Sequence, residues 1–369
     1  MVVSLLDDIM RAAFKARYPE VLPPVRLPKE GKPGQFYDAK VPSEEQKKLS
    51  KAMSKVQKLI NEGEYEPFFD ISKRFDVDRT KYPVAASPNQ TLDIMPAKSE
   101  TIAKYEEMYG GPEAFKNLQE AYLKGLDIPD SDRWYFMGQL EKEFIDEYGP
   151  GTGEEMFKKM FADSMASWTG GMDPTANLRA ALFENFMNFK KTGLPEAANQ
   201  YPYPIGGRFF SGNIKQAKKL KDQGGKIDPK TNPKRFNFST NFLGAADRAT
   251  IDEQMSKVAF GEAVPKPGTY GLAEKPVQRL AEKYGTDPRN VQEVIWHGGT
   301  GKKGKPMIQF INEAIERTSK ITGMTPKEVV RGMVRGSIPI FGLTTAAIIP
   351  QNMQQDILNY FSSVEKGGS

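Results

Sequence analysis

Helical periodicity is the feature that most constrains this sequence, and it dominates from about residue 99 onwards. Apolar residues recur there at spacings of three and four, and no stretch sustains the alternation of apolar and polar residues that a half-buried strand shows. The clearest helix lies in DPTANLRAALFENFMNFKKTGLP, with Asp173 as its N-cap, Pro174 at its first position, and Gly193 and Pro195 as its stop. We therefore expect an all-α core.

The same start and stop signals predict further helices along the rest of the chain. They lie at 134–148, 153–167, 211–223, 233–243, 252–260, 272–284, 288–297, 306–321 and 325–335. Before the periodic region, the run LPPVRLPKEGKPG cannot continue a helix, because proline lacks the backbone donor and restricts the residue before it. We expect an N-terminal extension with short helices and Pro-rich linkers over 1–98, a helical core over 99–335, and a C-terminal tail over 336–369.

The residue inventory excludes several kinds of chemistry. The sequence has no Cys and a single His, His297. Disulfides, thiolate zinc sites, iron–sulfur clusters, Cys nucleophiles and His pairs are therefore excluded, and catalysis would depend on carboxylates, Lys, Ser, Thr or Tyr. We expect neither a metal nor another cofactor. The net charge of +5 is compatible with nucleic-acid binding but does not diagnose it.

The apolar segments near the two ends predict no membrane association. The first residues, MVVSLLDDIMRAAFK, carry Asp7 and Asp8 where a signal peptide would be basic, and the late stretch SIPIFGLTTAAIIP is short and broken by Pro and Gly. We expect a soluble, intracellular protein. The tail GSIPIFGLTTAAIIPQNMQQDILNYF is apolar enough to dock either on the core or on a partner protein.

A basic loop and the histidine before it each have a plain interpretation. The loop GGTGKKGKP, 298–306, has the spacing GxxxxGK of a phosphate-cradling loop, but the preceding VQEVIW is helical in pattern and Pro306 occupies the position of the required hydroxyl. We interpret it as a solvated basic turn that contacts backbone phosphates at most nonspecifically. His297 follows Trp296 at the predicted helix end, where an imidazole satisfies terminal carbonyls, so we expect a cap rather than a catalyst.

Trp134 and Tyr135 form an aromatic pair in the predicted helix DRWYFMGQLEKEF. Such a pair usually packs in the core and at its rim, and we favour that interpretation. Aromatic side chains beside a groove also stack on unpaired bases. The two residues are therefore the candidates for base stacking in a nucleic-acid-binding protein.

The segment NPKRFNFSTNFLGAADRATIDEQMSKVAFG, 232–261, places a lysine and an aspartate at two consecutive helix beginnings, 18 positions apart (252 − 234). Lys234 follows Pro233 in the first turn, where the positive end of the helix dipole disfavours an ammonium. Taken singly, Asp252 is best interpreted as an N-cap and Lys234 as a surface charge. A partly desolvated lysine there would instead have a lowered pKa, and its neutral amine could attack an electrophilic carbon.

This segment resembles the helix-hairpin-helix DNA glycosylase superfamily of the endonuclease III type. In that family a lysine at the start of one helix precedes, at the same distance, an aspartate in a segment V-D-T-H-x-x-R-V. Lys234 and ATIDEQMSKV stand in those positions, Asn237 and Asn241 resemble the family's helix, and Lys257 stands where its arginine would be.

The resemblance continues upstream in the same order and covers roughly residues 130–300. FADSMASWTGGMDPTANLRAA and GGRFFSGNIKQAKKLKDQGG resemble the family's Asn-bearing helix and its glycine, aromatic and lysine helix. The family's Gly-x-Gly turn before the lysine is replaced by DPKTNPKR, and Gln254 replaces the usual histidine. The chain also resembles a group of uncharacterised bacteriophage proteins in which a WY helix, a Lys–Asp segment and a helix with Gln292 and Trp296 recur. That similarity implies a viral setting, in the host cytoplasm or associated with the virion.

The glycosylase resemblance implies a helix-hairpin-helix core that binds DNA and acts on a flipped base. Asp252 would stabilise an oxocarbenium-like cation or activate the attacker, and Lys234 would attack the sugar C1′. The candidates for DNA binding are Arg235, Arg248, Lys257, Lys215, Lys218 and Lys219. Two alternatives stay open: transfer of an amine onto a pre-activated base, and a non-catalytic DNA-binding or virion structural protein that keeps the helical scaffold.

Overall fold

Helices and their connections make up all of the chain that the computed structural model describes. It describes residues 66–72, 99–170, 174–189, 213, 217, 219, 227–261, 269–301, 305–322 and 324–337. Within these residues there is no strand, so the predicted all-α core is confirmed. In the same ranges no helix combines the length and the apolar character that crossing a membrane requires. Most of the predicted helix 211–223, the N-terminal extension and the C-terminal tail lie outside the described residues.

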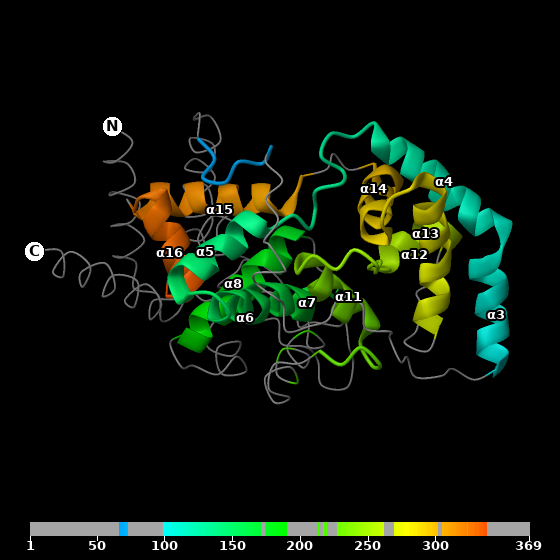
Figure 1. Ribbon diagram of the computed structural model, residues 1–369, viewed down its shortest axis with the longest axis horizontal. Helices are drawn as coiled ribbons and strands as arrows, with labels where there is room; N and C mark the ends of the chain where they lie inside the picture. The colour runs from blue at the N-terminus through cyan, green and yellow to red at the C-terminus, as the bar shows by residue number, and fades with distance from the viewer. Residues whose placement is uncertain are drawn as a thin grey trace, which may run out of the picture. The chain divides into compact units, whose positions relative to one another are not determined.

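The chain divides into two compact units. Figure 1 labels most of their helices. Unit 1 comprises Met1–Phe68, Gly170–Lys218 and Glu313–Ser369, and unit 2 comprises Phe69–Thr169 and Lys219–Asn312. Unit 2 contains α3 Ser99–Gly110, α4 Pro112–Leu126, α5 Gly138–Tyr148, α6 Thr152–Phe157, the π-helix η1 Lys158–Ala162, α7 Asp163–Trp168, α11 Pro233–Phe242, α12 Glu253–Phe260, α13 Tyr270–Tyr284 and α14 Pro288–Thr300. Unit 1 contains α8 Pro174–Phe189 and α16 Pro326–Arg335, and α15 Met307–Thr322 spans the boundary between the two.

Local chemistry explains why several of these helices begin where they do. Pro occupies the first position of α4, α11, α14 and α16, where its missing N–H costs no hydrogen bond. Asp287 and Thr325 cap α14 and α16 by accepting a hydrogen bond from the third residue of each helix. In unit 1, Glu328 completes a capping box with Thr325, and α16 buries Val329 and Met333 on its inner face.

Two predicted helices in unit 2 differ from the structure. The helix predicted at 134–148 begins only at Gly138, so Trp134 and Tyr135 lie in a turn rather than on a helix. The backbone N–H of Trp134 donates to Glu293 Oε2 (3.2 Å), and this tertiary bond, together with burial of Tyr135, overrides the local helical pattern. The helix predicted at 153–167 is interrupted by η1, whose wider turn is completed when the Asp163 N–H donates to the Lys158 carbonyl.

Unit 2 owes one of its closest helix contacts to glycines. Helices α4 and α14 cross so tightly that a Cβ on Gly298 would lie 1.9 Å from the carbonyl oxygen of Ala121, and one on Gly125 would lie 2.1 Å from that of Val294. Around this crossing, α12 and α13 contribute buried apolar side chains such as Met255 to a common core. Helix α14 therefore continues through Gly298 to Thr300, past the end predicted at 297.

A second group of unit 2 helices forms around α11. Phe242 of α11 packs edge-on against Phe161 of η1 and against Tyr135. Ser239 donates to the buried Asp163 carboxylate, which also pairs with Lys158 (Nζ–Oδ2 2.6 Å). These contacts fix α11, and with it the first turn that carries Lys234.

Candidate functional site

Lys234 lies in the first turn of α11 and is partly buried. Burial lowers the pKa of its ammonium, and the nearby Asp252 charge opposes that shift without cancelling it. Among the described residues, no carboxylate lies within 4 Å of the Lys234 ammonium and no hydrogen bond reaches it. The lysine predicted as a nucleophile is therefore neither a fully solvated charge nor one half of a tight ion pair.

Asp252 is the N-cap of α12, as predicted. Its Oδ1 accepts a hydrogen bond from the backbone N–H of Met255 (2.9 Å). The same carboxylate is close enough to act electrostatically on Lys234, Tyr135 and Tyr270. Capping and electrostatic influence are compatible, because one carboxylate oxygen serves the cap while the charge extends to its neighbours.

The segment Ala249–Ile251, which leads into Asp252, is buried and non-helical. Its backbone groups are bonded by side chains from two different helices. Asn237 of α11 donates to the Ala249 carbonyl (2.9 Å) and to Glu274 Oε1 (2.9 Å), and the same Glu274 oxygen accepts the Ala249 N–H (3.1 Å). The Tyr270 hydroxyl accepts the Ile251 N–H (2.7 Å) and donates to the Ala249 carbonyl (3.0 Å). The position of Asp252 is thus fixed through its backbone.

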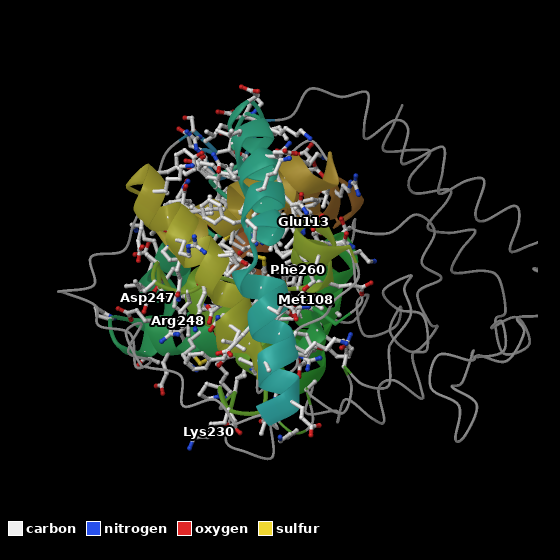
Figure 2. The ribbon with its side chains drawn as sticks, turned by 90° about the vertical axis from the view of Figure 1, so that its right-hand side faces the viewer. Met108, Glu113, Lys230, Asp247, Arg248 and Phe260 are labelled. Atoms are coloured by element: carbon white, nitrogen blue, oxygen red, sulfur yellow. The ribbon has the colours of Figure 1, made fainter. Side chains whose placement is uncertain are left out.

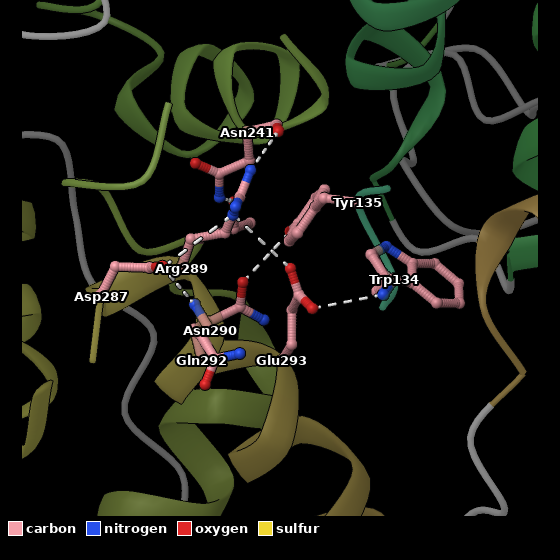
Figure 3. A network of polar contacts seen from close by, with 9 residues as sticks. Trp134, Tyr135, Asn241, Asp287, Arg289, Asn290, Gln292 and Glu293 are labelled. Carbon is pink, nitrogen blue, oxygen red and sulfur yellow. Dashed lines mark hydrogen bonds and ion pairs between the residues drawn. The ribbon is translucent and has the colours of Figure 1, made fainter. Parts of the chain in front are cut away.

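A second polar network joins the turn at Trp134 and Tyr135 to α14 (Figure 3). Tyr135 donates from its hydroxyl to Gln292 Oε1 (3.1 Å), and Arg289 Nε lies 3.9 Å from Glu293 Oε1. Burial raises the pKa of Glu293 to about 8, although the Arg289 charge opposes the shift. Burial raises that of Glu274, in the first network, to about 7. Buried carboxyls with such pKa values titrate near neutral pH.

The two aromatic candidates for base stacking occupy different environments. Tyr135 is only 2% exposed, and its ring packs edge-on against Phe238 and Phe242. Trp134 is half-buried and packs against Trp296, with ring centroids 5.6 Å apart. In this conformation Trp134 is the more accessible of the two.

The candidates for DNA binding also differ in how the fold uses them. Lys257 is exposed and pairs with Glu253 (2.6 Å), and Lys219 is exposed as well. Arg235 donates from Nε to the Ala166 carbonyl (3.2 Å) and so connects α11 to α7. Arg248 lies beside Asp247, 3.6 Å from Nε to Oδ2, with 14% of its side chain exposed (Figure 2). Lys215 and Lys218 lie outside the described residues.

His297 does not act as the cap expected for it. Helix α14 continues three residues further, and the imidazole is 0% exposed between Trp134 and Trp296. Neither ring nitrogen has a hydrogen-bond partner among the described residues. Burial lowers the pKa of His297 to about 4, so the ring is neutral at neutral pH. Its surroundings are those of a core side chain.

An open groove of about 830 Å³ lies where α3 meets α4, bordered by α12 and α14. Met108, Glu113 and Phe260 lie together along it (Figure 2), and Lys257 and Gly299 also line it. Neither Lys234 nor Asp252 is among its lining residues. In the part of the chain that the structure describes, no three His, Asp or Glu side chains gather as metal ligands.

Sequence patterns did not indicate Tyr270, Glu274 or Glu293 as part of the site. Each lies in a helix with an ordinary amphipathic pattern, and an acidic residue there is usually solvated. A signal that could have found Glu274 is its position one helical turn after Tyr270, which places both side chains on one face of α13.

Comparison with known proteins leaves the site to be interpreted from this geometry. No protein-family model, curated protein or solved structure matches the chain. A function for this chain can therefore be proposed only from the Lys234 and Asp252 environments and from the segment resemblances around them.

Proposed function

We propose that the protein acts on DNA in the manner of a helix-hairpin-helix glycosylase, through the adjoining beginnings of α11 and α12. Its substrate is a base flipped out of the duplex, which is then excised or modified. The observation that carries the proposal is the state of Lys234: partly buried, lowered in pKa, and influenced by Asp252 without an ion pair closer than 4 Å among the described residues.

The absence of a close pair in the described part of the chain matters for reactivity. A lysine paired with a carboxylate keeps its proton, and the nitrogen lone pair that binds this proton cannot attack a carbon. A desolvated lysine with a more distant carboxylate loses its proton more easily, and the amine becomes a nucleophile. Asp252 stays near enough to stabilise positive charge, because it influences Lys234 electrostatically.

The chemistry follows from these two groups. As the glycosidic bond breaks, its electron pair leaves with the base and positive charge develops at the sugar C1′, where the Asp252 carboxylate stabilises it. The neutral Lys234 amine forms a bond to C1′, and the proton that its nitrogen then loses neutralises the departing base. The C1′–O4′ bond of the sugar ring then breaks, O4′ keeps the electron pair and takes up a proton from water, and a protonated Schiff base remains between Lys234 and C1′. In base modification, an amine would instead form a bond to a pre-activated base, and the activating group would leave with the electron pair of its bond while the amine loses a proton.

The basic side chains suit a duplex bound through its phosphates. Lys257 and Lys219 are exposed, and contacts of that kind make binding strongly dependent on salt. Helix α11 lacks the Gly-x-Gly turn that grips a phosphate in the family it resembles, so backbone contacts are expected from these lysines instead.

A second candidate function is a non-catalytic DNA-binding or virion structural protein on the same scaffold. The observation that favours it is that Asp252 caps α12 and Arg235 connects α11 to α7. Both residues then have a purely structural role. This candidate predicts DNA binding that does not depend on the charge of Lys234 or Asp252.

The experiment incubates the full chain with duplexes that carry a panel of modified and damaged bases, with and without borohydride. We expect either base release with a trapped adduct on Lys234, or base modification. Lys234→Gln should abolish the adduct, and Asp252→Asn should slow the reaction by on the order of 10²–10³. Lys230→Gln is the matched control, because Lys230 is an exposed lysine in the turn before α11 and should retain the adduct.

Two outcomes would contradict the enzymatic proposal. One is the absence of released base, modified base and Lys234 adduct across the panel. The other is an adduct that Lys230→Gln removes and Lys234→Gln does not. Salt-dependent DNA binding that is unchanged in Lys234→Gln and Asp252→Asn, without any chemistry, would support the structural alternative.

A further inference from the structure

The segment that leads into Asp252 is held by hydrogen bonds from side chains of two helices. Ala249–Ile251 is buried and makes no helical hydrogen bonds, so its backbone groups need other partners. Two residues of α13, one helical turn apart, supply most of them: Tyr270 and Glu274. Both are 1% exposed.

Tyr270 uses one oxygen for two bonds. Its hydroxyl accepts the Ile251 N–H at 2.7 Å and donates to the Ala249 carbonyl at 3.0 Å. Ile251 immediately precedes Asp252, so this bond acts one residue from the carboxylate. Loss of the hydroxyl would leave the Ile251 N–H buried without this partner, which favours a shift of the segment.

Glu274 connects the same segment to α11. Its Oε1 accepts both the Ala249 N–H (3.1 Å) and the Asn237 amide (2.9 Å), and Asn237 also donates to the Ala249 carbonyl. Asn237 lies three residues after Lys234, on the same side of α11. A continuous path of hydrogen bonds therefore runs from the helix of Lys234 through Ala249 and Tyr270 to Ile251, the residue before Asp252.

We propose that Tyr270 and Glu274 are positioning residues that set the distance between the Asp252 carboxylate and the Lys234 amine. The effect of this positioning on catalysis rests on the proposed function. The relative position of the two charges does not depend on that function. The plainer alternative is that these side chains only satisfy a buried loop, in which case their loss would lower stability and leave the two charges unaffected.

The test compares Tyr270→Phe with Tyr109→Phe in the full chain. Both tyrosines are 1% exposed in unit 2, but the Tyr109 hydroxyl has no hydrogen-bond partner among the described residues. The two variants thus lose the same atom from equally buried positions. The readout is the pKa of Lys234, from an NMR titration with lysines labelled at Cε and the Lys234 signal assigned with Lys234→Arg.

The sign of the expected shift follows from the charges. Asp252 raises the pKa of Lys234, so Asp252→Asn should lower it. Tyr270→Phe should also lower the Lys234 pKa, by no more than Asp252→Asn does. Tyr109→Phe should leave the Lys234 pKa unchanged. Glu274→Gln keeps an acceptor oxygen at the same place and should preserve the Lys234 pKa, whereas Glu274→Ala should lower it.

The outcomes separate this inference from the proposed function. If the Lys234 pKa in Tyr270→Phe equals that in Tyr109→Phe, the positioning role is overturned, whether or not the protein reacts with DNA. If the pKa shifts as expected while no borohydride adduct forms in the wild type, the positioning role stands and the proposed function fails. Where the wild type reacts, Tyr270→Phe should lower the single-turnover rate while leaving the Kd for DNA unchanged.

Discussion

Gly298→Ala tests whether the glycines after His297 serve helix packing. A methyl group at this position would lie 1.9 Å from the Ala121 carbonyl oxygen and 2.5 Å from the Gly125 nitrogen. Ordinary contacts begin near 3.4 Å, so α4 and α14 would have to separate by more than an ångström. Because both obstructing atoms belong to the backbone, no side-chain rotation relieves the clash.

The magnitude follows from two opposing contributions. Overpacking a core costs about 1–3 kcal/mol, and a clash with backbone belongs at the upper end or beyond. Replacing Gly by Ala inside a helix returns up to about 1 kcal/mol. We therefore expect Gly298→Ala to lower the free energy of unfolding by about 2 kcal/mol or more. Gly110→Ala is the matched control: an added Cβ on this residue of α3 meets nothing within 4 Å, so stability should be unchanged or slightly higher.

Urea unfolding followed by tryptophan fluorescence measures the effect in the right place. The three tryptophans, Trp134, Trp168 and Trp296, all belong to unit 2, so their signal reports on the unit that contains the α4–α14 crossing. Equal midpoints and slopes for Gly298→Ala and Gly110→Ala would refute the packing argument. Gly298 would then be free to belong to the solvated basic turn that the sequence predicted at 298–306.

Three further predictions concern the site and its charges. Asp252→Ala should lower the free energy of unfolding by about 1 kcal/mol through loss of the α12 cap, whereas Asp252→Asn, which caps equally well, should not; equal losses in the two variants would contradict the cap. Burial raises the pKa of Glu293 to about 8, so between pH 6.5 and 8 the folded state keeps a proton that the unfolded state has lost. The free energy of unfolding should therefore fall as the pH rises through this range, by at most about 1.4 kcal/mol per pH unit for this group. The urea midpoint should depend less on pH across this range in Glu293→Gln than in the wild type. The range starts at pH 6.5 because the pKa of His297 is lowered from 6.5 to about 4, so below pH 6.5 this residue makes stability rise with pH. Lys257→Gln should weaken DNA binding for all sequences alike and reduce the salt slope by about 0.9, and a change confined to one DNA sequence would show that Lys257 does not contact phosphate.

The helix boundaries that the sequence predicted well are those set by local chemistry. Helix α11 begins at Pro233 as predicted, and Asp252 caps α12 as predicted. Such signals involve residues within four positions of one another, so their outcome is decided before any tertiary contact forms. The all-α class followed for the same reason, because the helical period is a property of adjacent turns.

The misjudged places are those where a distant element competes with the local pattern. Trp134 and Tyr135 fit a helical pattern. However, the Trp134 N–H donates to Glu293 and the Tyr135 hydroxyl donates to Gln292, both more than 150 positions away in the sequence. His297 and Gly298 fit a helix end, but α14 continues to Thr300, with Gly298 packed against α4 and the imidazole against Trp134. Helix propensity contributes less to stability than these buried contacts, so the contacts determined the structure at both places.

The sequence by itself determined the helical class, most helix beginnings and the cap at Asp252. Only the tertiary structure decided which polar side chains are buried. It places Tyr270 and Glu274 against the segment before Asp252. It also desolvates Lys234 without a close partner among the described residues. The physical reason is that a helix pattern specifies which residues share a face. Whether that face meets water or another helix depends on segments far away in the chain, and burial of this kind sets both pKa values and the cost of an unbonded polar group.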